Sequence, residues 1–262
     1  MFRLTREVRF AINHREEDAR AVTNSYAGYP SLTGLGHYFT LAVTVAGDLS
    51  RDSSYLLNIK DIDQAVRQVA IPRIAKIIRR RPQEFGAPLL LELFDLLEST
   101  WKSATLEKLV LSLSPFLNLS IHSSERPMTR LSQKFEFAAS HRLHNPALSD
   151  EKNRQTYGKC NNPHGHGHNY ELEVTLTGNP TSSGLLANIP AFEETVARTV
   201  IDRFDHKNLN IEVPEFAAVI PSVENIAKVI YGLLKPKLQS EHSHLASVTV
   251  WETPKTWCEY SE

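Results

Sequence analysis

The sequence predicts an α+β protein with two tandem domains, each a four-stranded antiparallel sheet with two helices on one face. Two observations predict this class. First, the segment Gly34–Gly47 matches Gly165–Gly178, and a unit of about 130 residues that occurs twice indicates a domain duplication rather than a solenoid. Second, both copies follow the order strand, strand, helix, helix, strand, strand. That order is typical of helices gathered on one face of an antiparallel sheet.

Two shorter pairs of segments also match between the copies. They are Phe10–His14 with Phe137–His141 and Leu56–Ile59 with Leu186–Ile189. The polar segment Ser123–Pro127 ends in proline, and such segments mark domain boundaries. We therefore predict a first domain over residues 1–124 and a second over residues 128–262.

The elements of the first copy follow from its apolar patterns and turn residues. The expected strands lie near residues 2–13, 37–47, 107–113 and 116–121, and the expected helices near 60–80 and 89–101.

The second copy reads in the same order. Its expected strands cover about residues 130–143, 166–178, 246–252 and 256–260, with helices at about 190–203 and from about Ser222 onward. Pro190 suits a first helical turn, and the hydroxyl of Ser222 can cap a helix. Asn145-Pro146 and Ser149-Asp150 indicate a polar loop after the first of these strands.

Composition excludes several classes of partner. The chain is 41% hydrophobic and 23% charged, with a net charge of −1, so no basic surface favours nucleic acid or an anionic membrane. The sequence has no apolar run of the roughly 20 residues that a membrane span needs, and we expect no signal peptide because the first residues lack its apolar segment. Cys160 and Cys258 are the only cysteines, which makes a reducing cytoplasm the expected location.

Three histidines predict a metal site in the second copy. His166 and His168 are two residues apart at the start of an alternating strand, so their side chains point to the same face. His141 ends the preceding strand and can join them across an antiparallel pair. Three neutral imidazoles suit Zn²⁺ and leave its fourth position open for substrate. The neighbouring His144 and His164 are expected to be loop residues.

Cys160 lies near these histidines, and the residues alone leave its role open. It can be a fourth zinc ligand, a buried apolar thiol, or a base whose thiolate is favoured by adjacent cations such as Lys159. Cys258, beside Trp257 in the last strand, is expected to serve packing.

Two further motifs, Asp205-His206 and Glu252, do not indicate a function by themselves. Asp205 can orient and balance the charge of His206 for proton transfer, but the pair can equally be an exposed turn. Glu252 ends a strand and can accept paired N–H bonds from a guanidine-like ring edge, or it can be an exposed charge. Taken alone, each motif is more typical of exposed surface residues than of a functional site.

Together the motifs of the second copy resemble those of the 6-pyruvoyl-tetrahydropterin synthase and 6-carboxy-tetrahydropterin synthase family, which has the tunnelling fold. The resemblance covers about residues 128–262 and rests on segments that occur in the family's order. These are Phe137–Leu143, Leu148–Asn153, Tyr157–Tyr170, Asp205–Leu209, Val223–Asn225 and Glu252-Thr253.

This resemblance implies a zinc-dependent phosphate-eliminating lyase of tetrahydrobiopterin biosynthesis. The implied substrate is 7,8-dihydroneopterin triphosphate and the product 6-pyruvoyl-tetrahydropterin, with no redox cofactor. The implied roles are as follows: His141, His166 and His168 hold Zn²⁺; Cys160 is the base; Asp205 and His206 complete the proton relay; Glu252, Ser222 and Glu224 bind the pterin. The implied active sites form between neighbouring protomers, so a homo-oligomer is expected.

Some positions depart from the family pattern. Ser222 and Val223 stand where the family often has two threonines, and Ala191-Phe192 where it commonly has Asp-Leu. We have no functional account of the second change. The first copy keeps His14 and His37 but has Leu35 where the second has His166. With Leu113 opposite Glu252 as well, we expect the first copy to be a metal-free scaffold domain.

Two alternatives remain from the sequence. A 6-carboxy-tetrahydropterin synthase of queuosine biosynthesis resembles this chain but usually has a shorter spacer than the five residues between Cys160 and His166. A non-catalytic pterin-binding module is the other, and the degenerate first copy motivates it.

Overall fold

The protein forms two compact units in a computed structural model that describes residues 1–14, 27–80, 86–180, 184 and 186–262. Unit 1 comprises Met1–Leu131 with Thr177–Leu186, and unit 2 comprises Ser132–Leu176 with Ala187–Glu262. Each unit contains sheet and helices, so the predicted α+β class is confirmed.

Unit 1 contains a four-stranded antiparallel sheet. Its strands, in spatial order, are β1 (Phe2–Asn13), β2 (Gly36–Gly47), β3 (Thr105–Ser114) and β4 (Leu117–His122). Along β2 the buried residues alternate, with Phe39, Leu41 and Val43 on one face. This period of two is what a sheet with one packed face requires. All four predicted strands are present.

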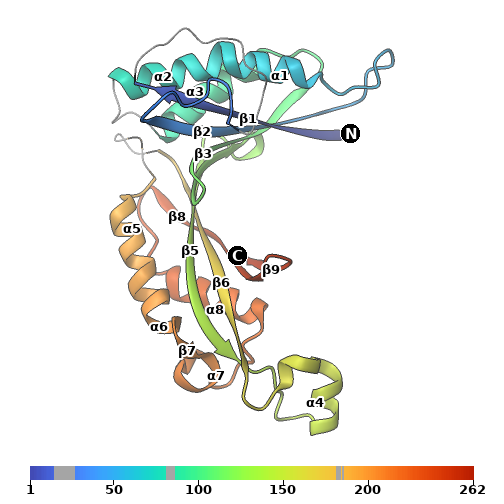
Figure 1. The fold of residues 1–262 in the computed structure, drawn as a ribbon, viewed down its shortest axis with the longest axis vertical. Coiled ribbons are helices and arrows are strands. Elements are labelled where there is room, and N and C mark those ends of the chain that lie inside the picture. The colour runs from blue at the N-terminus through green and yellow to red at the C-terminus, as the bar shows by residue number, and fades with distance from the viewer. Residues whose placement is uncertain (15–26, 81–85, 181–183, 185) are drawn as a thin grey trace. The chain divides into compact units, whose positions relative to one another are not determined.

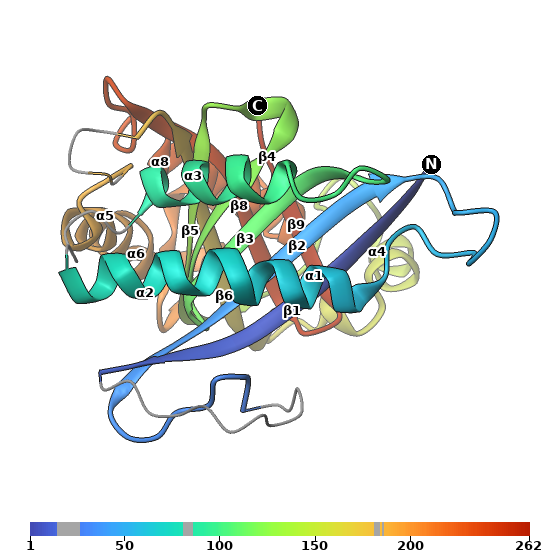
Figure 2. The same cartoon turned by 90° about the horizontal axis from the view of Figure 1, so that it is seen from above.

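The helices of unit 1 cover one face of β1 to β3, as Figures 1 and 2 both show. They are α1 (Ile59–Ala65), which continues through a π-helical segment (Val66–Ala70) into α2 (Ile71–Arg80), and α3 (Ala87–Glu98). Asn58 caps α1, because its side chain accepts a hydrogen bond from the backbone N–H of Lys60. Their apolar sides, including Ile74 and Leu93, are fully buried.

Unit 2 repeats the strand order of unit 1. Its strands are β5 (Thr129–His141), β6 (His166–Gly178), β8 (Ser243–Thr253) and β9 (Thr256–Tyr260), in the order β5-β6-β8-β9. A short strand, β7 (Lys207–Asn208), pairs in parallel with the end of β5. Pairing of Ala139 with Lys207 holds the connection that carries Asp205 and His206 against β5.

Two helical segments accompany this sheet. One runs through α5 (Ile189–Val196), a π-helical segment (Ala197–Ile201) and α6 (Asp202–Phe204). The other is α8 (Val223–Leu234), which packs on β8 and β9. Ser222 caps α8 through its Oγ, as predicted, and Ile226 and Ile230 are fully buried on its inner side.

The polar loop predicted after β5 instead contains a helix, α4 (Asp150–Tyr157), followed by a 3₁₀ turn (Gly158–Asn161). Ser149 caps α4 by accepting a hydrogen bond from the N–H of Lys152, and Asp150 and Glu151 favour its first turn. The expectation was wrong because α4 has no apolar periodicity. Figure 1 shows α4 in yellow-green beyond the ends of β5 and β6.

Three other short elements complete the described chain, and none of them was predicted. They are two 3₁₀ turns, Ser123–Glu125 and Pro214–Phe216, and one short helix, α7 (Leu209–Glu212). Within the described residues, no helix combines the length and apolar character needed to cross a membrane.

Candidate metal centre and active site

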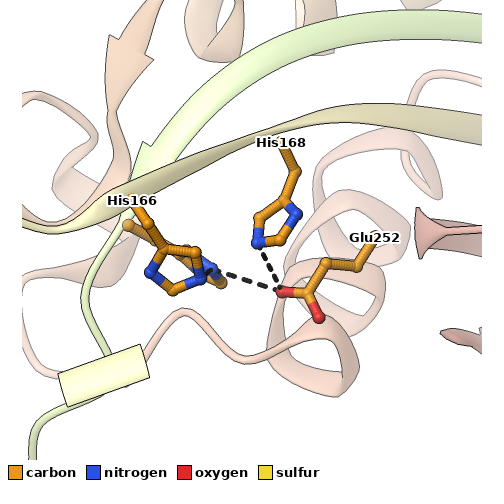
Figure 3. Close-up of side chains that lie close together, drawn as sticks. His166, His168 and Glu252 are labelled. Atoms are coloured by element: carbon orange, nitrogen blue, oxygen red, sulfur yellow. Dashed lines mark hydrogen bonds and ion pairs between the residues drawn. The ribbon is translucent and has the colours of Figure 1, made fainter. Parts of the chain in front are cut away.

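Four potential metal ligands converge in unit 2. His141 is the last residue of β5, His166 and His168 open β6, and Glu252 lies near the end of β8. One ligand atom from each of the four lies within 4.8 Å of all the others. Figure 3 shows the rings of His166 and His168 and the carboxylate of Glu252 pointing toward a common point.

Local backbone geometry brings the histidines together. Gly165 has φ +74°, and a Cβ at this position would lie 3.0 Å from the carbonyl oxygen of His141. Only glycine adopts this conformation and this close approach without strain. The chain then enters β6, where His166 and His168 share a face. The expected grouping of His141 with these two histidines is therefore present.

The hydrogen bonds of His141 define which of its nitrogen atoms faces the site. The ring is fully buried, and its Nδ1 lies 2.7 Å from the carbonyl oxygen of Pro221. A carbonyl can only accept, so Nδ1 carries the hydrogen and donates it. This bond orients Nε2 toward the other ligands, as second-shell carbonyls do for histidines that bind metals.

Nε2 of His141 faces a second imidazole nitrogen and a carboxylate oxygen. Nε2 lies 3.1 Å from Nε2 of His166 and 3.2 Å from Oε1 of Glu252. Nε2 of His168 lies 3.5 Å from the same carboxylate oxygen, and it is buried with no hydrogen-bond partner. A single proton can bridge only one pair of these close nitrogen and oxygen atoms. A cation bound among them would interact favourably with each of them.

The donor set fits zinc. Three imidazole nitrogens are ligands that Zn²⁺ takes in proteins, and they leave the fourth of its usual four positions to the carboxylate of Glu252 or to a substrate oxygen. The described residues contain no other group of three or more such ligand atoms within this distance of one another. Because Cys160 lies outside this group, the structure does not support the thiol as a fourth ligand.

The electrostatics of the site favour the protonation states that a metal requires. Burial lowers the pKa of His166, and the neighbouring His141 and His168 lower it further. Burial likewise lowers the pKa of His168. The close contact with His141, 3.2 Å away, holds the pKa of Glu252 below its usual value. Near neutral pH the two rings are therefore neutral and the carboxylate is charged, as metal binding demands.

Tyr170 forms the floor of the site. It is fully buried, stacks on Phe137 with ring centroids 4.9 Å apart, and places its hydroxyl 3.4 Å from Nδ1 of His141. Burial raises the pKa of its phenol, with Glu252 adding to the effect. Sequence reasoning missed Tyr170, although its position two residues after His168 puts it on the ligand face of β6.

Cys160 lies beside the metal ligands in a cavity of about 930 Å³. The cavity is lined by Arg142, Asp150, Arg154, Gly158, Lys159, Cys160, Asn161, Asn162, Pro163, His166 and His168. The thiol is partly exposed there, so a bound molecule can touch it and the two histidines together. Cys258, in β9, is not among the lining residues, and burial raises its pKa.

Asp205 and His206 form the expected dyad, with Oδ2 of Asp205 2.8 Å from Nδ1 of His206. Oδ1 of Asp205 accepts the backbone N–H of Ala138 at 2.7 Å, which is the main reason that the pKa of this carboxyl is lowered. The His206 N–H in turn donates to the Ala138 carbonyl, and His206 has a left-handed backbone with φ +57°. The dyad is thus firmly attached to β5.

The dyad opens onto a different hollow from Cys160. That second cavity, of about 540 Å³, is lined by His206 and His168 together with residues 138–140, 167, 169, 207, 208 and 212. His206 is well exposed, with 83% of its side chain accessible. Within one chain, the structure therefore brings Cys160 but not the dyad into the larger cavity.

The predicted pterin-binding residues other than Glu252 lie at the start of α8. Ser222 accepts the N–H of Asn225 as its cap, and Glu224 is exposed in the first turn. Neither residue lines the two cavities described above. Pro221, immediately before them, accepts the hydrogen bond from His141, so the start of α8 adjoins the metal ligands.

The corresponding positions in unit 1 have fewer potential metal ligands. The rings of His14 and His37 lie edge to face with centroids 5.8 Å apart. Leu35 is 92% exposed, so the apolar residue that stands where unit 2 has His166 projects into solvent. Leu113 lies at an irregularity between β3 and β4. The two imidazoles have no third ligand nearby among the described residues.

Comparison with known proteins places this site in a family. The family model described as "6-pyruvoyl tetrahydropterin synthase" matches residues 130–262, just over half of the chain. The chain is 39% identical over 138 residues to the 6-pyruvoyl tetrahydrobiopterin synthase of Drosophila melanogaster, covering 52% of this chain and 82% of the relative.

Two further matches are more distant. The 6-carboxy-5,6,7,8-tetrahydropterin synthase of Haemophilus influenzae is 27% identical over 156 residues, covering 52% of this chain and all of the relative. The solved structure of the Caenorhabditis elegans 6-pyruvoyl tetrahydropterin synthase is 35% identical, with a TM-score of 0.49, and covers 52% of this chain and 96% of that one. The chain belongs to the 6-pyruvoyl tetrahydropterin synthase family.

Proposed function

We propose that the protein is a zinc-dependent 6-pyruvoyl-tetrahydropterin synthase, a phosphate-eliminating lyase that acts on 7,8-dihydroneopterin triphosphate. One observation carries the proposal: the four ligand atoms of His141, His166, His168 and Glu252 converge beside the cavity that contains Cys160. Membership of the family and the activity named for the Drosophila relative support it.

In this proposal His141, His166 and His168 hold the zinc ion. When bound, zinc supplies Lewis acidity that binds the side-chain hydroxyls of the substrate and acidifies the adjacent C–H bonds. The Pro221 carbonyl keeps the ring of His141 in the orientation this requires. Glu252 anchors the edge of the pterin ring, and its position 3.2 Å from His141 would hold that ring close to the metal ligands.

Cys160 is the proposed base. It takes a proton from carbon in the cavity that it shares with His166 and His168. Asp205 and His206 complete the proton relay. Their opening onto a separate hollow supports a site shared between protomers, in which the dyad serves the cleft of a neighbouring copy. Ser222 and Glu224 contribute to pterin binding.

The two units have different proposed roles. Residues 128–262 form the catalytic tunnelling-fold domain, and residues 1–124 form a metal-free copy that occupies a protomer's place in a homo-oligomer. The exposed Leu35 and the pair of His14 and His37 support the second assignment. Two free cysteines, Cys160 and Cys258, are consistent with a reducing cytoplasm.

The alternative product is 6-carboxy-tetrahydropterin. The spacer of five residues between Cys160 and His166 favours the pyruvoyl branch, as does the higher identity to the Drosophila relative than to the Haemophilus one. Incubation of the zinc-loaded protein with dihydroneopterin triphosphate and identification of the product by mass spectrometry separates the two. We expect 6-pyruvoyl-tetrahydropterin and triphosphate; recovery of carboxypterin and acetaldehyde would exclude the first choice.

A non-catalytic pterin-binding module is the second alternative. The substitution Cys160→Ala should retain zinc and pterin binding and abolish turnover, because the thiol lines the cavity without belonging to the ligand cluster. Cys258→Ala is the matched control and should keep full activity. A wild-type protein that binds zinc and pterin but forms no product would favour the binding module.

A further inference from the structure

We propose that Arg142, Arg154 and Lys159 form an oligophosphate-binding subsite on the wall of the large cavity in unit 2. The inference deepens the proposed function and rests on it for the identity of the anion, which is the triphosphate of the substrate. None of these three residues is a metal ligand, the base or a member of the proton relay in the proposed function.

The charges that line the cavity are unequal. Three basic side chains, Arg142, Arg154 and Lys159, contribute to its wall, against the single carboxylate of Asp150. The whole chain has a net charge of −1, so this local excess of positive charge is not a general property of the protein. A cavity lined mainly by one sign of charge concentrates ligands of the opposite sign.

Hydrogen bonds hold the backbone and the Nε of Arg142 in place, while the two terminal nitrogens of its guanidinium remain available to a ligand. Its backbone N–H donates to the side-chain oxygen of Asn210 at 2.7 Å, and its carbonyl accepts from the same amide at 3.0 Å. Its Nε donates to the carbonyl of Asn161 at 3.2 Å. In the described part of the chain its two terminal nitrogens have no partner, so they can donate in parallel to phosphate oxygens.

The other two cations are carried by a rigid support. Buried Asn153 in α4 donates to the carbonyls of Asn145, Leu148 and Ser149, at 2.9, 3.1 and 3.2 Å, and accepts the N–H of Asn145 at 2.8 Å. These bonds fix α4 on the loop that precedes it. Side chains carried by α4 and by the turn that follows it are thereby placed along the cavity.

Lys159 and Arg154 are available to a ligand. The side chain of Lys159 is exposed, and its ammonium makes no hydrogen bond or ion pair within the described residues. Arg154 lies 3.5 Å from Glu151, and both side chains are more than two-thirds exposed. An ion pair of this kind contributes little to stability, so Arg154 can exchange it for a phosphate.

The arrangement suits an elimination reaction. Cys160, His166 and His168 line the same cavity as the three cations, which allows one molecule to reach both groups. In the elimination, a proton leaves carbon for the base, and the carbon–oxygen bond breaks with its electron pair passing to the departing triphosphate. Fixed cations beside that leaving group stabilise the charge it gains.

The test measures binding of inorganic triphosphate to the full-length protein by titration calorimetry, with substrate kinetics in parallel. We compare the wild type with Arg142→Gln, Arg154→Gln and Lys159→Gln. The matched control is Lys152→Gln, because Lys152 belongs to α4 but does not line the cavity. Metal-free protein is used for the calorimetry, so that triphosphate cannot bind through zinc.

We expect Arg142→Gln and Lys159→Gln each to weaken triphosphate binding by about tenfold or more, as loss of a charge-assisted hydrogen bond does. Arg154→Gln should weaken it less, and Lys152→Gln should leave it unchanged. Substrate KM should rise in the same order, while binding of phosphate-free dihydroneopterin stays the same. Arg142→Lys, which keeps the charge but loses the paired donors, should recover part of the loss.

The triphosphate titrations and the product assay can fail independently of each other. Equal triphosphate affinity in the wild type and all variants would overturn the subsite, even if the protein makes the pterin product. Triphosphate binding that depends on Arg142 and Lys159, in a protein that forms no product, would support the subsite and refute the synthase activity.

Discussion

Replacing His166 with leucine tests the metal centre most directly. Unit 1 already carries leucine at the matching position, where Leu35 immediately precedes β2 and is 92% exposed, so this copy of the fold accommodates a leucine there. In unit 2, His166→Leu removes the ring whose Nε2 lies 3.1 Å from that of His141. The change should therefore reduce zinc binding without unfolding the protein.

The size of the effect follows from the loss of one of the three histidine ligands. Structural zinc sites with four protein ligands have a binding free energy of about 10–16 kcal/mol, or about 3 kcal/mol for each ligand, and we take this value for one histidine. Loss of one ligand should weaken zinc binding about 100-fold. In excess zinc the stabilisation of the folded state should fall by about 2.7 kcal/mol.

The metal-free protein should respond differently. His166→Leu removes the imidazole nitrogen that faces Nε2 of His141 and replaces a ring that is only partly buried. We therefore expect the free energy of unfolding without zinc to change by less than about 1 kcal/mol. Zinc affinity from competition with a chelator and urea unfolding with and without zinc measure the two quantities.

His164→Leu is the matched control, since His164 is an exposed loop histidine outside the ligand cluster. It should leave zinc affinity unchanged. A His166→Leu protein with the same zinc affinity as the wild type would refute the assignment of His166 as a zinc ligand. An equal loss of affinity in both variants would show that the effect does not depend on the cluster.

Three other predictions concern the surroundings of the site. Asn153→Ala should lower the free energy of unfolding by about 2–4 kcal/mol, because the buried amide of Asn153 makes four hydrogen bonds that its backbone partners would lose; a change below about 0.5 kcal/mol in urea unfolding would contradict this. Tyr170→Phe should reduce zinc affinity less than tenfold, since the carbonyl of Pro221, at 2.7 Å rather than 3.4 Å, is the nearer partner of the same imidazole; a larger loss in a chelator competition would assign the hydroxyl a main role. Folding lowers the pKa of His166 and His168, so their contribution to the stability of the metal-free protein should be complete above about pH 6.5 and decline as pH falls toward the folded pKa values. Unfolding curves between about pH 8 and pH 5, for the wild type and a double His→Gln variant, measure this. A wild-type stability that rises on acidification, without the same rise in the variant, would contradict the expected direction.

Much of the fold could be predicted from local pattern. The strands of both copies were predicted to within about three residues at either end, because alternating burial leaves a period-two signal in the sequence. The cap at Ser222 was also correct. Helix α4 was missed, since its order depends on the buried amide of Asn153 and a capping serine rather than on an apolar stripe.

The sequence by itself determined that His141, His166 and His168 would meet. Spacing of two residues puts two rings on one face of β6, and the antiparallel partner strand ends at the third. The ligand grouping of these histidines therefore depends on strand geometry, which the local sequence specifies.

Only the tertiary structure decided what else joins them. Glu252 reaches the cluster because β8 lies next to β6, and the Pro221 carbonyl reaches His141 because α8 packs beside that sheet. The same packing turns Asp205 and His206 toward a different hollow from Cys160. These contacts join residues far apart in the chain, and their positions follow from how helices and strands pack, which no local pattern encodes.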